Sequence, residues 1–307
     1  SGSSVNGAYN LALANGRVLT VNASGSSALT GVVSGTDVVL VKQGAGALVL
    51  AGANSYSGGT TVSAGNIGVS HNTALGTGAA TLADGTTVLL NSSVTAVAND
   101  WVINGATTLN ASSVTASLSG RITGAGGWLI NAASGALTLS GDNAYTGSTT
   151  LNAGTVITTH LHALGNNSAV SLSNVSGTLL QLNSSLNVGS LTGGGSTGGN
   201  LVLGTGAVLT AGADNTSSTF GGAISGAGGL AKSGTGTWTL TSNGTYTGTT
   251  TVNAGILVLS NNAPTTASAS FGGAGSLRIE SVGTGFTGAF STSGWTFANT
   301  LGGLTVG

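Results

Sequence analysis

A block of about 20 residues recurs three times in this 307-residue chain, and this internal repeat constrains the fold more than any other feature. The copies occupy 46–65, 135–154 and 236–255, and they align without a gap. The interval from the start of one copy to the start of the next is far longer than one turn of a typical solenoid. Each long unit is therefore expected to hold about four or five coils of roughly 20 residues.

The apolar residues inside the block predict short strands separated by corners. Leu48 and Leu50 stand on even positions, as does Val62, whereas Ile67 stands on an odd position after Gly65. Alternation with a period of two is typical of a strand, and a change of parity requires one extra residue, which makes a corner. The other two copies repeat the switch, so we predict an all-β, right-handed parallel β-helix with little or no helix. The residues expected to point inward are Leu48, Leu50, Val62, Ile67, Leu137, Leu139, Leu151, Val252 and Leu257.

The composition favours the same architecture and excludes several classes of protein. Gly supplies 56 residues without a period of three, and Pro occurs once, which excludes a collagen-like chain. Cys is absent, so neither disulfides nor thiolate metal sites can form. Charged residues make up only 4% and the net charge is −1, which leaves nucleic-acid binding without an electrostatic basis. Because 40% of the residues are hydrophobic, the chain is expected to fold.

An antiparallel sandwich is the alternative fold. It would need a tight turn about every 8–12 residues. Asp84-Gly85 and Asn104-Gly105 are the best candidates for such hairpin turns.

Similarity outside the block suggests the organisation of the chain. Residues 29–35 match 118–124 and 220–226. We expect residues 1–263 to form one repetitive β-helix with three long units, about 29–117, 118–219 and 220–263. From Pro264 the composition changes, and 264–307 are expected to continue the coils or to begin a further module.

Candidate chemical groups are few and scattered. A β-helical enzyme that cleaves polysaccharides needs clustered carboxylates for Ca²⁺ and a Lys or Arg base. The aspartates here occur singly, at Asp37, Asp84, Asp100, Asp142 and Asp214. His160 and His162 would place two imidazoles on one strand face, as a metal site does, but solvent-facing side chains near a corner explain them better. We therefore expect no catalytic, cofactor-binding or metal-binding residue.

Three tyrosines occupy the same place in the three copies. Tyr56, Tyr145 and Tyr246 would suit a platform for sugars, although their position between Asn and Gly favours a structural role. In that role the ring covers a corner and the hydroxyl reaches water. The Thr60-Thr61 pair and its copies resemble ice-binding ladders, but the copies lie too far apart to stack on neighbouring coils.

The block follows the pattern G-A-L-x-L-x-G-x-N-x-Y-x-G-x-T-T-x-x-A-G, which resembles the passenger-associated β-strand repeat of bacterial autotransporters. The third copy departs from it, because Ser242-Asn243-Gly244 replaces Gly-x-Asn. Residues 286–307 are also similar to stretches of haemagglutinin-like surface proteins. The repeat positions expected to be structural are Leu48, Leu50, Tyr56, Gly65, Leu137, Leu139, Tyr145, Gly154, Trp238, Leu240, Tyr246 and Gly255.

The resemblance implies a passenger that is exported with the help of an outer-membrane translocator to the cell surface or the medium. We expect a structural or adhesive β-helical rod that is not an enzyme. The alternatives are a subunit of a self-assembling extracellular filament and, third, a polysaccharide-acting module. Few charges and open strand edges favour association with other copies, end to end or side by side. Host or surface glycans are further expected partners, and nucleic acid is not.

Overall fold

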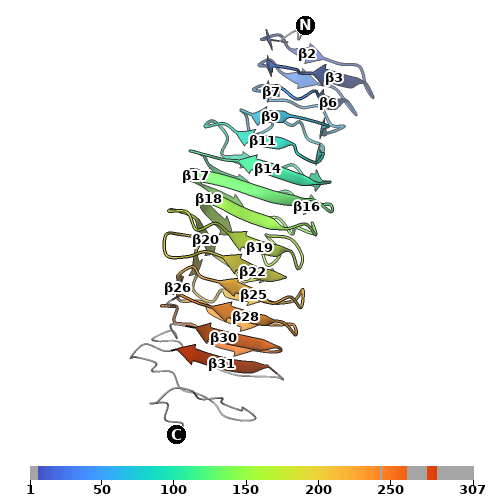
Figure 1. Ribbon diagram of the computed structural model, residues 1–307. Helices are drawn as coiled ribbons and strands as arrows, with labels where there is room; N and C mark the ends of the chain where they lie inside the picture. Colours follow the sequence, from blue (N-terminus) through green and yellow to red (C-terminus); the bar gives the residue numbers. More distant parts are fainter. Residues whose placement is uncertain (1–5, 243, 261–274, 282–307) are drawn as a thin grey trace. The chain divides into compact units, whose positions relative to one another are not determined.

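The computed structural model describes residues 6–242, 244–260 and 275–281, and it divides the chain into two compact units, 1–149 and 150–307. The described residues form strands and connecting corners without helix, so none of them makes a helix able to cross a membrane. All described strand pairs are parallel, and successive partners lie one coil apart (Figure 1). The predicted all-β parallel β-helix is confirmed.

The first unit stacks its coils as three sheet faces. On its first face each strand pairs with the strand one coil later, as in Val18↔Val39 and Leu40↔Thr60. These strands are β3 (Val18–Asn22), β6 (Val39–Gln43), β8 (Thr60–Val62), β10 (Ala80–Leu82), β13 (Trp101–Ile103) and β16 (Ile122–Thr123).

The second and third faces of this unit meet in one long strand, β17 (Gly127–Leu139). Its first half continues the second face and its second half continues the third. The second face also contains β1 (Asn6–Gly7), β4 (Ser26–Leu29), β7 (Ala47–Leu50), β9 (Asn66–Val69), β11 (Thr87–Leu90) and β14 (Ala106–Asn110). The third also contains β12 (Ala96–Val97) and β15 (Thr115–Leu118), and a separate pair joins β2 (Leu11–Ala12) to β5 (Val33–Ser34).

The interval from the first copy of the repeat to the second is not a whole number of coils. Just before the first copy, β6 lies in the first face, and within the copy β7 lies in the second. The corresponding stretch of the second copy is β17, whose halves lie in the second and third faces. Since the interval between the two copies contains four coils and part of a fifth, the second copy is rotated by one face relative to the first.

The second unit repeats the three-faced arrangement with coils of slightly different lengths, as the pairs Leu230↔Thr250 and Thr155↔Leu179 show. One face holds β18 (Thr149–Thr158), β20 (Leu179–Leu182), β23 (Asn200–Leu203) and β26 (Ile224–Gly226). The next holds β21 (Leu186–Val188), β24 (Val208–Ala211), β27 (Gly229–Lys232) and β29 (Thr250–Val252). The third holds β19 (Ala169–Leu172), β22 (Ser190–Gly193), β25 (Ser218–Phe220), β28 (Thr237–Leu240), β30 (Ile256–Ser260) and β31 (Ser276–Ser281).

The core of each unit consists of apolar side chains stacked in register. On the first face of the first unit, Val62, Leu82 and Ile103 are successive partners and all are fully buried. Every residue that the sequence placed inward is at most 2% exposed, so that prediction is confirmed. Burial of a Val or Leu side chain contributes about 1.5–3 kcal/mol, and a continuous ladder gains this at each coil.

The antiparallel alternative is wrong for the described strands. Asp84-Gly85 and Asn104-Gly105 lie at successive corners, where Gly85 has a positive φ of 70° and its N–H donates to Ala106 O of the next coil. The long-unit boundaries stay a prediction. Of 264–307, only Gly275 and β31 belong to the described residues, and β31 pairs with β30.

Replacing Leu139 by Asp tests the inward ladder. Leu139 is 2% exposed and pairs with Leu118 of the previous coil, so the new carboxylate would be buried without a partner. We expect a loss of about 3–5 kcal/mol in the free energy of unfolding, measured by chemical denaturation. Thr138→Asp is the matched control, because Thr138 points outward on the same strand. Equal stability of the L139D variant and the parent would contradict the inward placement.

Candidate functional site

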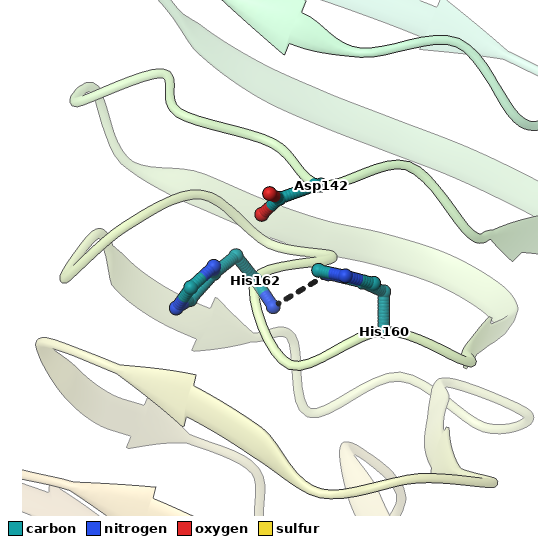
Figure 2. A group of neighbouring side chains, drawn as sticks. All are labelled: Asp142, His160 and His162. Carbon is teal, nitrogen blue, oxygen red and sulfur yellow. Dashed lines mark hydrogen bonds between the residues drawn. The ribbon is translucent and has the colours of Figure 1, made fainter.

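His71 and His160 cap equivalent turns. In each turn the imidazole Nδ1 accepts a hydrogen bond at 3.2 Å from the backbone N–H two residues later. The donor is the N–H of Thr73 in the first copy and that of His162 in the second; Figure 2 shows the second. This geometry matches an Asx turn, in which a side chain satisfies a nearby main-chain donor. The corresponding Asn261 of the third copy lies outside the described residues.

The hydrogen bond that His160 Nδ1 accepts from the His162 N–H limits how these two histidines could bind a metal. Their ring centroids lie 5.9 Å apart in the second unit, whereas Asp142, also drawn in Figure 2, belongs to the first. A neutral imidazole carries one proton, and an accepting Nδ1 places that proton on Nε2. A metal at Nε2 of His160 would require the proton to move and the turn to lose its cap. The absence of a metal site stays a prediction.

The aspartates serve as acceptors at corners. Asp84 Oδ1 accepts the N–H of Ala106, and Asp100 Oδ1 accepts that of Arg121, each at 2.7 Å and from the following coil. Asn and Ser side chains do the same elsewhere, as Asn200 does for Ala223 N. A carboxylate in these positions is therefore exchangeable with a neutral acceptor, which is typical of a structural role.

Asp214 and Asp37 also make hydrogen bonds with neighbouring residues. Asp214 Oδ1 accepts hydrogen bonds from the backbone and side chain of Thr216. Although burial raises the pKa of Asp214, hydrogen bonds from Thr216 and Ser190 outweigh it and hold that pKa below its usual value. Asp37 has a positive φ of 55°, and its N–H donates to Ser57 Oγ. None of these contacts joins two carboxylates to a base.

The repeat tyrosines are inside the coils. Tyr56, Tyr145 and Tyr246 are at most 1% exposed, so their rings offer no platform for sugars. Each hydroxyl lies 2.6 Å from the Oγ1 of a threonine four residues later. The expectation that the hydroxyl reaches water is wrong, because the ring turns inward and the threonine replaces water as its partner. The three threonines, Thr60, Thr149 and Thr250, are themselves buried.

A buried asparagine bridges three coils beside this tyrosine. Asn54 Oδ1 accepts the N–H of Val33 from the coil before, and its Nδ2 donates to Ala74 O in the coil after, at 2.7 and 2.6 Å. Asn143 Oδ1 accepts the N–H of Ile122 in the same way at 2.8 Å. The Asn-x-Tyr spacing that these two copies share is thus used to hold successive coils together.

The first face of the first unit carries an outward column that sequence reasoning missed. Its members are β-branched and uncharged, and they stack on six successive coils in the order Thr20, Val41, Thr61, Thr81, Val102 and Thr123. The side chains beyond Thr20 are half-buried. The signal in the sequence is the recurrence of Thr or Val once in every coil, an interval much shorter than that between copies of the repeat.

Comparison with known proteins identifies the repeated block. The model of the passenger-associated-transport-repeat matches residues 40–67, 134–157 and 230–259. These three segments contain the three copies of the repeated block. A segment of 98 residues is also 46% identical to the "Adhesin BmaC autotransporter" of Brucella suis biovar 1 (strain 1330). That match covers 31% of this chain and 3% of the adhesin. No solved structure matches.

The resemblance to autotransporter passengers is therefore confirmed, and with it the predicted location outside the cell or on its surface. Within the passenger repeats, the paired Leu or Trp positions point inward: Leu48, Leu50, Leu137, Leu139, Trp238 and Leu240 are at most 4% exposed. The corner glycines Gly65, Gly154 and Gly255 adopt positive φ values of 70°, 82° and 67°, which favour glycine.

The buried tyrosines predict how stability depends on pH. Burial raises the pKa of Tyr56 and Tyr246 to about 12, against the smaller opposing effect of their hydrogen bonds to Thr60 and Thr250. Above a pH of about 10 the unfolded chain releases protons that the folded chain retains, so the free energy of unfolding falls. We expect it to be unaffected by these groups below pH 10 and to decline by up to about 1.4 kcal/mol per pH unit for each tyrosine between pH 10 and 12.

Denaturation curves measured from pH 8 to 12 would reveal this decline. Tyr246→Phe removes one titrating group and should make the decline shallower, even if its midpoint at pH 8 is lower than that of the parent. An identical slope for parent and variant would contradict the assignment.

Proposed function

We propose that this chain is a segment of a secreted adhesive passenger, and that the uncharged first face of its first unit binds other copies of the same protein. The observation that carries the proposal is the column from Thr20 to Thr123, which presents only Thr and Val over six coils. The passenger repeats and the similarity to an adhesin support an adhesive role. An outer-membrane translocator assists export in this proposal.

The physical basis is the lack of charge. Only 4% of the residues are charged, whereas the surface of an ordinary soluble domain is about 25–35% charged. Both lysines are buried, which reduces the charge on the surface further. Copies of this protein therefore repel one another weakly, and a flat β-branched face associates by packing and hydrogen bonds. Such contacts persist at high salt because little of the attraction is Coulombic.

Light scattering and sedimentation at tens of micromolar test this association. We expect the parent to self-associate to a similar degree at low and high ionic strength. Placing lysines at Thr61 and Thr81, on adjacent coils of the column, should reduce association at low salt through repulsion between copies. Thr87 and Thr108 provide the matched control, because they are half-buried neighbours in register on the second face.

Different outcomes separate the candidate functions. Growth into particles of unlimited size would favour the filament subunit, and discrete small oligomers would favour adhesive contacts between passengers. A parent that is monomeric at every salt concentration would contradict homotypic binding and would leave host or surface glycans as the partners of the adhesin.

An enzymatic role has less support. Asp84, Asp100 and Asp214 accept main-chain hydrogen bonds, and the relative found among the known proteins is named an adhesin. We expect purified protein to release no unsaturated or reducing ends from acidic polysaccharides with or without Ca²⁺. Cleavage that disappears in Asp84→Asn or Asp100→Asn, variants that keep the corner acceptor, would contradict this expectation.

A further inference from the structure

Both lysines of the chain lie inside the coils. Lys42 and Lys232 are 0% and 1% exposed, Lys42 near the end of strand β6 and Lys232 at the end of β27. Lys42 stands between Val21 and Val62 in an inward ladder, so its methylene stem packs where other coils carry an aliphatic side chain. Lys232 stands in the same way between Ala211 and Val252.

The two ammonium groups contact equivalent main-chain carbonyls. Lys42 Nζ donates to Gly44 O at 2.6 Å and to Ala64 O at 2.8 Å. Lys232 Nζ donates to Gly234 O at 2.8 Å and to Ala254 O at 3.4 Å, and also to Ser233 O. In each case the glycine acceptor lies in the corner that follows the lysine, and the alanine acceptor lies in the corner one coil later. In both sites the glycine acceptor lies 2 residues after the lysine, and the alanine acceptor lies 22 residues after it.

Glycines keep the space around the second ammonium group open. A Cβ atom at Gly212 or at Gly255 would lie 2.9 Å from Lys232 Nζ. Both glycines also have positive φ values, 114° and 67°, which direct their neighbouring carbonyls differently from a regular strand. Asp214 is the acidic residue whose negative charge acts on the Lys232 ammonium group, and this interaction is Coulombic.

Among the three copies of the repeat, the lysine occurs in the two whose following corner holds five residues. Five residues, 43–47, separate Lys42 from the next inward residue, Leu48, and five, 233–237, separate Lys232 from Trp238. In the second copy the inward position is taken by Ala132, and only four residues, 133–136, precede Leu137. In both five-residue corners the carbonyl two residues after the lysine accepts a hydrogen bond from its Nζ, and a main-chain carbonyl shielded from water is costly when it loses its donor.

We propose that the five-residue corner of this repeat is a binding site for a primary ammonium group, formed by main-chain carbonyls of two successive coils and filled by the chain's own lysine. The site goes beyond the adhesive role, because it recognises a chemical group and not a surface. A free primary alkylammonium ion is the class of ligand that the site would take when the lysine is truncated. n-Propylammonium reproduces the atoms removed from Lys42 in Lys42→Ala.

Chemical rescue of the whole chain tests the proposal. We expect Lys42→Ala to lower the melting temperature by about 4–8 °C, since two buried acceptors lose their donor. n-Propylammonium chloride should restore at least half of this loss, whereas tetramethylammonium chloride at the same concentration should not, because it has no N–H. Lys42→Met fills the stem site without a donor, so it should be destabilised and show no rescue. Equal effects of the two salts, or unchanged stability of both variants, would overturn the proposal.

Shortening the corner provides an independent test that does not need the ligand. Deleting Ala45 in the Lys42→Ala chain gives the four-residue corner found after Ala132. We expect this combination to be more stable than Lys42→Ala alone, whereas the same deletion beside an intact Lys42 should destabilise the parent. If Lys42→Ala does not fold, recovery of folded protein by the deletion still supports the proposal that the five-residue corner needs an ammonium group. Failure of the deletion to improve Lys42→Ala would overturn it.

Discussion

Parallel hydrogen bonding between successive coils is the interaction on which everything else in each unit depends. Once a coil lies in register on the one before it, every inward side chain meets an inward side chain and every corner meets a corner. Apolar ladders such as Val62, Leu82 and Ile103 then form without any contact between distant parts of the chain. Stability becomes a sum of contributions from neighbouring coils, as expected of a solenoid.

This stacking uses most of the polar chemistry in the described coils. Strands pair through their backbones, but corners leave donors and acceptors that regular pairing does not satisfy. Asn54, Asp84 and Asp100 accept N–H groups from neighbouring coils, while Lys42 donates to two corner carbonyls. The tyrosine of each repeat is satisfied by a threonine four residues later. Side chains that might be taken for catalytic or sugar-binding groups in sequence are thus partners of the main chain.

The sequence allowed the inward ladders and the parallel architecture to be predicted, because alternation and the parity change at Gly65 are local signals. It did not allow the tyrosine hydroxyl to be placed, since that depends on which way the ring turns at a corner. Nor did it reveal the column through Thr61 and Thr81, which can be recognised only once the local coil length is known. The role of Lys42 was hidden for a related reason: the two carbonyls that it contacts, those of Gly44 and Ala64, come together only when two coils stack.

The mismatch between repeat and coil has a consequence for how such a passenger presents its surface. Because the second copy lies one face further round than the first, identical motifs do not stack and do not build a common outer patch within the first unit. The motif instead supplies inward residues: Leu48 and Leu50 are buried on the second face, and their counterparts Leu137 and Leu139 are buried on the third. Surface properties follow the period of the coil and not that of the repeat, as the column from Thr20 to Thr123 does. Substitutions outside the motif can therefore change the binding face while the repeat continues to specify the coil.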